Sequence, residues 1–265
     1  FLPSGEILIT ERPGTLKKIK ISALEPFDNT QGDAFGIGKI IPIEGVRHIG
    51  EGGLLGLTLH PQFEKNHFIY LYLTTKKDGG LVNRVERYRW KEDKLFDRKV
   101  ILDGIPGAAF HDGGRIVFGP DGNLYITTGD AGKPNLAQDI NSLAGKILRI
   151  SDEGKIPQDN PFSNAVYSFG HRNSQGLAWD DKGRLWATEH GSSALDELNF
   201  IEKGANYGWP VIRGNEERAG MKTPKVNSDP KETWAPAGAV YFKKRIFFTG
   251  LRGESLYEAK ISDGG

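Results

Sequence analysis

Short segments of alternating apolar and polar residues recur along the chain, and a turn-forming sequence precedes four of them. These four turn-and-strand segments occupy residues 3–8, 61–71, 120–125 and 181–186. Their turn positions, Pro3, Pro61, Pro120 and Asp180, lie about 58 to 60 residues apart, close to the longest β-propeller blades and far above leucine-rich or ankyrin repeats. Each interval therefore predicts about one four-stranded antiparallel blade.

Alternation with a period of two predicts strands, and no long segment shows the 3.6-residue apolar period of a helix. Turns such as Pro-Asp-Gly at 120–122 and Lys-Asp-Gly-Gly at 77–80 supply the positive-φ residues that tight hairpins need. The predicted fold class is therefore all-β. The predicted strands cover residues 7–10, 17–21, 68–74, 85–90, 115–118, 124–128, 147–150, 176–179, 185–188, 197–201, 239–242, 246–249 and 255–261.

The repeat predicts a single β-propeller domain over residues 1–265 that holds roughly four and a half blades. A fifth turn and strand follow at 242–248, and the sequence ends before another full blade. Because a propeller must close its ring to protect the sheet edges, we expect strands to be missing at one or both ends. The alternative is a naturally short propeller. The polar segment 213–229 is expected to be a long inter-strand loop.

The chain is nearly neutral, with 35 Lys and Arg against 34 Asp and Glu. This balance gives no basic footprint for nucleic acid or an anionic membrane, so a small molecule or a protein is the expected partner. No apolar run approaches the length of a membrane span, and the start at Phe1 lacks the regions of a signal peptide, so any export signal would have been removed or lie upstream. The absence of cysteine excludes disulfides and thiolate catalysis but leaves the compartment open.

A histidine and an aspartate lie at the two ends of one predicted hairpin. His111 precedes the strand at 115–118, and Asp130 follows the strand at 124–128. If they meet, the carboxylate would orient the imidazole and raise its basicity, which is the layout of a general base. The alternative is that His111, which precedes a glycine pair, is an ordinary residue of a surface loop.

The segment 170–176 concentrates hydrogen-bonding side chains in front of a predicted strand. Arg172 can bind a carboxylate through two parallel hydrogen bonds, and Asn173 supplies both a donor and an acceptor. This set suits a multiply anionic or carbonyl-rich ligand. The alternative is a polar turn in which Arg172 bridges to a neighbouring blade.

Carboxylates and loop carbonyls are mixed in the segments 188–199 and 204–210. Calcium collects six to eight oxygens at flexible geometry, so these segments favour a calcium site. Zinc is the competitor because of His190, but a single imidazole without a thiolate disfavours it. The alternative without a metal is that Asp196 and Glu197 cap a turn.

Together these motifs resemble the soluble pyrroloquinoline-quinone (PQQ) dependent aldose sugar dehydrogenases, the glucose/sorbosone dehydrogenase family. The similarity lies in residues 111–130, in Gly-His-Arg-Asn-Ser-Gln-Gly at 170–176 and in Gly-Ala-Asn-Tyr-Gly-Trp-Pro at 204–210. The sequence Glu-Gly-Gly-Leu-Leu-Gly at 51–56, the His-Pro pair at 60–61 and the segment 142–149 add to it. The resemblance covers essentially the whole chain. It implies a six-bladed propeller of four-stranded antiparallel blades, which would need roughly 350 residues.

The resemblance implies oxidation of the anomeric carbon of an aldose to a lactone. His111 would act as the general base that takes the proton of the C1 hydroxyl while a hydride passes to PQQ, and Asp130 would hold His111 in place. Arg172, which we also count among the catalytic residues, and Asn173 would bind the quinone oxygens and carboxylates. Glu51 takes the place of a cofactor-contacting glutamine. Its carboxylate would repel the tricarboxylate PQQ unless it were protonated, turned away or bound to a metal.

The resemblance also implies Ca²⁺ at two places. One ion would lie on the cofactor, held by the backbone carbonyls of Gly191 and Ser192, and would polarise the quinone as a Lewis acid. Ser192 stands where some members carry proline, which changes little because the ligand is a carbonyl oxygen. A second, structural ion would be bound by Glu197 and the carbonyl of Tyr207. Further basic cofactor contacts come in this family from the last blade, which would lie beyond Gly265.

The predicted function is thus a PQQ-dependent aldose dehydrogenase, periplasmic or secreted, which passes electrons to an external acceptor and is a monomer or homodimer. One alternative is a non-catalytic propeller that binds a protein or glycan, but such a module has no reason to keep His111, Asp130 and Arg172 together. The other is a calcium-dependent lactonase or esterase. That enzyme would need several carboxylate and amide side chains around a channel calcium, whereas the loops here offer mostly carbonyls.

Overall fold

The computed structural model describes residues 1–20 and 36–262, which form five antiparallel sheets. The first sheet contains β1 (Ile7–Glu11), β2 (Thr15–Lys20) and β3 (Gly36–Pro42). The second contains β4 (Leu54–Leu59), β5 (Phe68–Lys77), β6 (Gly80–Lys91) and β7 (Lys94–Pro106), and helix α1 (Phe63–Asn66) connects β4 to β5. The third contains β8 (Ile116–Phe118), β9 (Leu124–Thr128), β10 (Lys146–Ile150) and β11 (Val166–Phe169), and the 3-10 helix η1 (Pro134–Ala137) lies between β9 and β10. The fourth contains β12 (Ser174–Trp179), β13 (Leu185–Glu189), β14 (Glu197–Ile201) and β15 (Val226–Asn227), and the fifth contains β16 (Pro236–Phe242), β17 (Arg245–Gly250) and β18 (Ser255–Lys260).

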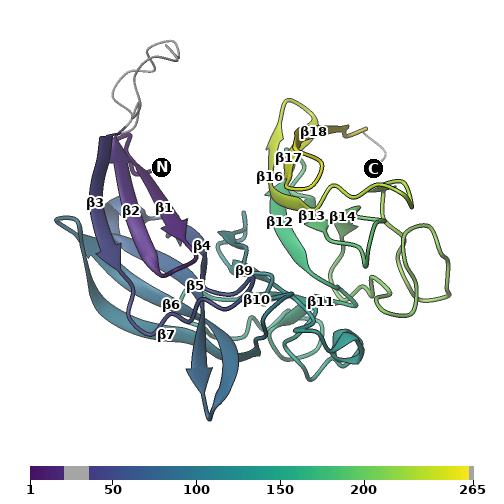
Figure 1. The fold of residues 1–265 in the computed structure, drawn as a ribbon, viewed down its shortest axis with the longest axis horizontal. Coiled ribbons are helices and arrows are strands. Elements are labelled where there is room, and N and C mark those ends of the chain that lie inside the picture. Colours follow the sequence, from purple (N-terminus) through teal and green to yellow (C-terminus); the bar gives the residue numbers. More distant parts are fainter. Residues whose placement is uncertain (21–35, 263–265) are drawn as a thin grey trace.

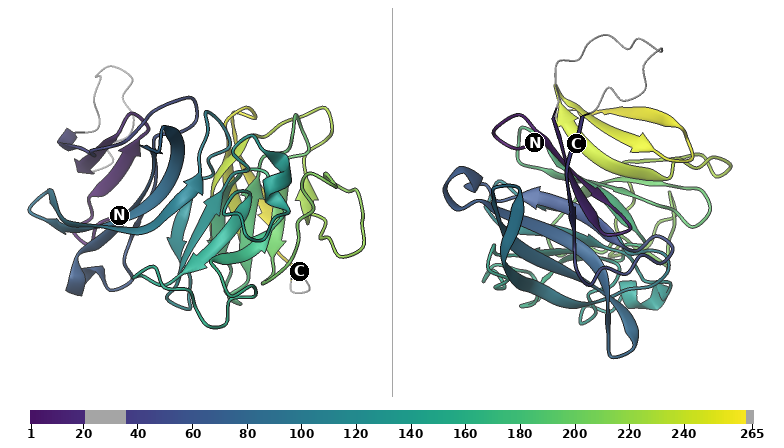
Figure 2. Two further views of the ribbon diagram at one scale, coloured as in Figure 1. Left: turned by 90° about the horizontal axis from the view of Figure 1, so that it is seen from below. Right: turned by 60° about the vertical axis from the view of Figure 1, so that its left-hand side comes forward.

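The five sheets follow one another around an arc, from β1–β3 to β16–β18 (Figure 1), and Figure 2 shows the same succession from two further sides. Neighbouring sheets contact one another through their first two strands: β4 and β5 meet β8, β9 meets β12, and β12 and β13 meet β16. This radial order of antiparallel sheets is that of a β-propeller. The predicted all-β propeller class is confirmed.

The number and size of the blades differ from the prediction. The described residues form five sheets of three or four strands rather than the six four-stranded blades that the resemblance implies. In the last four sheets the repeated turn lies between the first and second strands, whereas the turn at 3–5 precedes β1. Since the repeated turn precedes β1 as it precedes the second strands of the other sheets, β1 occupies a second-strand position. The first sheet therefore has three strands, which are equivalent to the second, third and fourth strands of the other sheets.

Each predicted strand has a counterpart in the structure, but several strands were not predicted. The segment 17–21 corresponds to β2, although Ile21 lies outside the described residues. β3, β4, β7 and β11 have no counterpart in the prediction. The expected loop 213–229 is also not wholly irregular, because it contains the two-residue strand β15, which pairs with β14.

Apolar side chains fill the spaces between neighbouring sheets. Tyr72, Ile116 and Leu148 belong to one buried cluster that joins the second and third sheets, and Ile147 and Leu177 to another that joins the third and fourth. All five residues of β9 and all five of β10 are buried, because these central strands have a neighbouring sheet on each face. No helix of the described residues is long and apolar enough to cross a membrane.

The two ends of the sheets carry different sequences. The repeated turns at 60–67, 119–123 and 180–184 connect first strands to second strands at one end. The segments that lead into β4, β8 and β12 lie at the opposite end, together with the segments that follow β9 and β13. Most predicted site residues belong to this second group of segments, so the fold brings them to one end of the molecule. Glu197 begins β14 at that end, and Tyr207 lies in the segment after β14, where its N–H donates to the carbonyl of Phe169 at the end of β11.

Candidate functional site

His111 and Asp130 meet as the hairpin prediction required. His111 lies in the segment before β8 and Asp130 directly follows the bridge residue after β9, so the antiparallel pairing of β8 with β9 brings both to the same end. His111 Nδ1 lies 2.7 Å from Asp130 Oδ1. The carboxylate is fully buried, and 15% of the imidazole is exposed. His111 has a φ of 60°, a left-handed conformation that turns its side chain toward Asp130.

Asp130 is held as a carboxylate by several donors. Its Oδ1 also accepts the Gly132 N–H at 2.8 Å, and its Oδ2 accepts the indole N–H of Trp209 at 2.8 Å. Burial alone would raise the pKa of Asp130, but the hydrogen bonds from His111, Trp209 and Gly132 hold it below its ordinary value. A carboxylate at Nδ1 requires that nitrogen to carry the proton, which leaves Nε2 of His111 to act as a base.

Glu51 contacts the main chain of His111. Its Oε2 accepts the His111 N–H at 2.8 Å, and its own N–H donates to the carbonyl of Ala109 at 2.8 Å. The neighbouring Asp112 is buried, and its Oδ1 accepts the amide N–H of Asn83 at 2.8 Å. Burial raises the pKa of Asp112. Both carboxylates therefore fix the backbone segment that carries His111.

Arg172 and Asn173 lie beside this pair. Asn173 is buried and its Oδ1 accepts the Gly113 N–H at 3.0 Å, which joins β12 to the segment of His111. The guanidinium of Arg172 donates to the carbonyl of His190 at 3.3 Å, and its Nε is buried without a hydrogen-bond partner in the described part of the chain. Burial lowers the pKa of Arg172. A half-buried guanidinium with donors to spare suits an anionic ligand.

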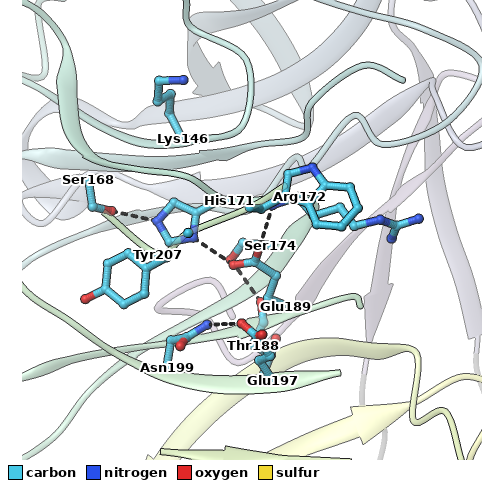
Figure 3. A network of polar contacts seen from close by, with 12 residues as sticks. Lys146, Ser168, His171, Arg172, Ser174, Thr188, Glu189, Glu197, Asn199 and Tyr207 are labelled. Atoms are coloured by element: carbon cyan, nitrogen blue, oxygen red, sulfur yellow. Dashed lines mark hydrogen bonds and ion pairs between the residues drawn. The ribbon is translucent and has the colours of Figure 1, made fainter. Parts of the chain in front are cut away.

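His171 has a structural role that the sequence did not reveal. Its Nδ1 lies 2.7 Å from Glu189 Oε2 and its Nε2 lies 2.8 Å from Ser168 Oγ, as Figure 3 shows. The fully buried ring stacks on Tyr207 at 4.7 Å. Glu189 also accepts the backbone N–H of Arg172. His171 and Glu189 thus fix the backbone of Arg172. The motif at 170–176 was the only sequence signal for His171, and it assigned no role to this residue.

The four residues predicted to bind calcium lie around one pocket. The pocket is bordered by Gly191, Ser192, Glu197, Tyr207, Arg172 and Trp209, among others. The predicted metal residues and the predicted cofactor-binding arginine therefore share one cavity, although they come from segments far apart in the sequence.

The charges at this pocket fit a cation. Glu197 lies directly opposite Glu189 in the β13–β14 ladder. Burial and the nearby charge of Glu189 raise the pKa of Glu197 to about 8. Asn199 donates to Glu197 at 3.0 Å (Figure 3), and its buried Oδ1 has no hydrogen-bond partner among residues 1–20 and 36–262. Two facing carboxylates and an unpaired amide oxygen are groups that a hard cation stabilises.

A side-chain cluster of the zinc type is absent from the described residues, which contain no group of three or more His, Cys, Asp and Glu able to hold a metal. Nε2 of His190 lies 2.8 Å from the carbonyl of Pro236, so this ring is engaged with the main chain. Any metal at the pocket would therefore depend on backbone carbonyls and few carboxylates.

Asp196 caps a turn, as the alternative without a metal proposed. Its Oδ1 accepts the Gly191 N–H at 2.8 Å. Its Oδ2 accepts the Thr233 hydroxyl at 2.8 Å and the N–H groups of Trp234 and Ala235 at 2.6 and 2.9 Å. Asp196 thus orders the loop that presents the carbonyl of Gly191. Glu197 accepts only the Gly214 N–H from the main chain, at 3.2 Å, and faces the pocket.

The chain is similar to proteins of known type. The family model described as Glucose / Sorbosone dehydrogenase matches residues 1–264. Quinoprotein glucose dehydrogenase B of Acinetobacter calcoaceticus is 35% identical over 249 residues, which cover 82% of this chain and 50% of that protein. Aldose sugar dehydrogenase YliI of Escherichia coli K12 is 34% identical over 245 residues, covering 86% of this chain and 62% of that protein.

Among solved structures, the PQQ-bound form of aldose sugar dehydrogenase from Streptomyces coelicolor superposes with a TM-score of 0.87 at 39% identity. The superposition covers 99% of this chain and 76% of that chain. The present chain spans about half to three fifths of the length of the two curated relatives.

Proposed function

Because the chain belongs to the glucose/sorbosone dehydrogenase family, we propose that it acts in a quinoprotein that oxidises the anomeric carbon of an aldose sugar to a lactone. The observation that carries this proposal is the contact of 2.7 Å between His111 and a buried Asp130, beside a guanidinium with unused donors. The periplasm or the cell exterior is the proposed location, and an external acceptor is proposed to remove the electrons.

His111 is proposed to act as the base. Its Nδ1 is fixed by Asp130, so Nε2 can take the proton of the C1 hydroxyl, while the hydrogen on C1 leaves with its electron pair and a C=O bond forms. Glu51, through the N–H of His111, keeps this residue in its left-handed conformation. With its carboxylate engaged in this way, Glu51 supports the base rather than opposing the charge of a cofactor.

Arg172 and Asn173 are the proposed ligands of PQQ. The unpaired Nε of Arg172 and the absence of a hydrogen-bonded carboxylate at its guanidinium in the described chain fit a multiply anionic group. The Asn173 oxygen is engaged by Gly113, so its amide nitrogen is the group left for a quinone oxygen. The chemistry that PQQ supplies when bound is acceptance of a hydride, assisted by a Ca²⁺ that polarises the quinone.

Ca²⁺ is proposed to be held at the shared pocket. The carbonyls of Gly191 and Ser192 would hold the ion of the cofactor, and Glu197 with the carbonyl of Tyr207 would hold a structural ion. The raised pKa of Glu197 supports this assignment, because a cation would offset the repulsion between Glu197 and Glu189. Retention of His111, Asp130 and Arg172 in one site favours this enzyme over a propeller used only for recognition.

The test is reconstitution of the full-length protein with PQQ and Ca²⁺, followed by dye-linked oxidation of glucose, galactose and other aldoses. His111→Ala is expected to lower kcat by about 100- to 10,000-fold, the usual contribution of a general base, and omission of Ca²⁺ is expected to lower turnover. His60→Ala is the matched control, since His60 faces Asp152 at 3.5 Å at the opposite end of the sheets. No quinone-dependent turnover, or equal turnover of wild type and His111→Ala, would refute the mechanism.

A further inference from the structure

Trp209 contacts both Asp130 and Arg172 in the candidate site. Its indole N–H donates to Asp130 Oδ2 at 2.8 Å, on the oxygen that His111 does not use. Its ring lies below the guanidinium of Arg172, with 5.4 Å from Cζ to the ring centroid. The side chain is half-buried and borders the pocket. A single aromatic residue thus joins the carboxylate that orients the proposed base with the guanidinium proposed to bind an anion.

The backbone of Trp209 is fixed from two sides. Gln138, which ends η1, donates from Nε2 to the Trp209 carbonyl at 2.7 Å, and the Trp209 N–H donates to the Gly170 carbonyl at 2.9 Å. Gln138 also exchanges hydrogen bonds of 3.0 and 2.8 Å with the amide of Asn206. These contacts hold the indole at a defined distance from Asp130, independently of His111.

We propose that Trp209 is a positioning residue that sets the strength of the His111–Asp130 pair by holding the second oxygen of Asp130. Its catalytic consequence rests on the proposed function. The N–H of Trp209 stabilises negative charge on Asp130 and so moderates how strongly this carboxylate attracts a protonated imidazole. Without that N–H, the carboxylate bonds His111 more strongly, and the imidazole takes up its proton at higher pH.

In the described part of the chain, four charged groups lie in or around the His111–Asp130 pair. Asp130 binds Nδ1, Glu51 binds the backbone N–H, Asp112 follows in sequence, and Arg172 acts on Asp130 through its charge. Replacement of Trp209 by Phe changes none of them and keeps an aromatic face below Arg172. The substitution therefore removes the N–H donor while it keeps a smaller aromatic ring at this position.

The test follows the imidazole of His111 by NMR in the cofactor-free, isotope-labelled protein as pH is varied. In Trp209→Phe the midpoint of this titration is expected to move upward, because the partner carboxylate has lost one hydrogen-bond donor. An unchanged or lower midpoint in a folded variant overturns the proposal. The measurement needs neither PQQ nor sugar, so a failure of the proposed dehydrogenase activity is seen separately.

A matched control lies at the far turn of the fourth sheet. The indole N–H of Trp186 donates to Asp180 Oδ2 at 3.1 Å, so Trp186→Phe removes the same kind of bond and is expected to leave the His111 midpoint unchanged. Wild-type protein gives a second measurement that does not depend on a variant. The indole N–H resonance of Trp209 should titrate with the midpoint of His111, whereas that of Trp186 should not. A Trp209 resonance that does not follow His111 contradicts the shared carboxylate.

Discussion

The carboxylate of Asp130 joins His111 to Trp209 in the candidate site. It accepts hydrogen bonds from His111, Gly132 and Trp209 while fully buried, and these donors hold its pKa below the ordinary value despite burial. Such an arrangement stabilises the folded state only while the group is ionised. The same bonds that orient the base should therefore contribute to stability in a pH-dependent way.

Replacing Asp130 by Asn should reveal this contribution. Because the folded pKa lies below the unfolded value of about 3.9, the contribution is fully present above that pH and is lost as pH falls through the folded value. Asp130→Asn is expected to cost about 1–3 kcal/mol near neutral pH, the range for hydrogen bonds to a charged group. Urea unfolding of both proteins at pH 7, 5 and 3 measures the difference. A difference in the free energy of unfolding between wild type and Asp130→Asn that stays constant down to pH 3 would contradict an ionised Asp130 in the folded protein.

Residue identity and hairpin geometry were enough to predict part of the site. His111 and Asp130 flank adjacent strands, so the connection between the strands already implied that they could meet. The bond between Trp209 and Asp130 joins residues 79 positions apart, and no local pattern predicts such a contact. His171 stands next to Arg172 in the sequence, yet its burial and its bond to Glu189 depend on the pairing of β12 with β13.

At the scale of elements, Lys146 anchors the segment between β9 and β10. It begins β10, is fully buried, and its Nζ donates to the carbonyls of Leu136, Ala137 and Ala144 at 2.8, 2.9 and 2.6 Å. The segment includes η1, which is followed by Gln138, the residue that holds Trp209. Nζ of Lys146 thus fixes an element that supports the candidate site.

Stability should depend on the protonation of Lys146. Burial lowers its folded pKa to about 7, whereas an unfolded lysine titrates near 10.4. Between these values the unfolded chain binds more protons, so stability conferred by Lys146 should rise with pH. Relative to Lys146→Met, wild type should gain about 1 kcal/mol per unit between pH 7 and pH 10. Urea midpoints at each pH test this, with Lys133→Met, an exposed change in the same segment, as control. A pH-independent difference would contradict the buried, low-pKa amine.

Elements that the alternating pattern missed are mostly strands without one clearly apolar face. β7 is exposed at most of its positions, and its sequence KLFDRKVILDGIP shows no regular alternation. β4 reads LLGLTL, an apolar run rather than an alternating one, because it packs against neighbours on both sides. Backbone pairing with β5 and β6 specifies these strands more than their own sequences do.

For the whole molecule, the repeat length was predicted but the position of the repeat within a sheet was not. Turn spacing reveals the period, since each blade uses one tight turn between its first two strands. It does not reveal which strand the turn follows. For that reason the first sheet was counted as a full blade, whereas β1 occupies a second-strand position and only β2 and β3 follow it.

The sheets approach one another most closely at glycines of their first strands. A Cβ on Gly56 of β4 would lie 2.1 Å from the carbonyl of Gly114, next to β8, and one on Gly176 of β12 would lie 2.4 Å from the carbonyl of Ala237 in β16. The hydroxyl of Thr188 donates to that same carbonyl at 2.8 Å. A side chain at Gly176 would therefore force the fourth and fifth sheets apart.

Gly176→Ala is expected to destabilise the protein by about 1–3 kcal/mol, the cost of overpacking a close contact, with a lower urea midpoint as the readout. Gly80→Ala is the matched control, because a Cβ there would lie 3.7 Å from its nearest neighbour, outside any close contact between sheets. Moving the fourth and fifth sheets apart would also move the loop of Gly191. Gly176→Ala should therefore weaken binding of the Ca²⁺ proposed at the pocket more than Gly80→Ala does. Equal stability of the two variants would show that the first strands do not set the spacing of the blades.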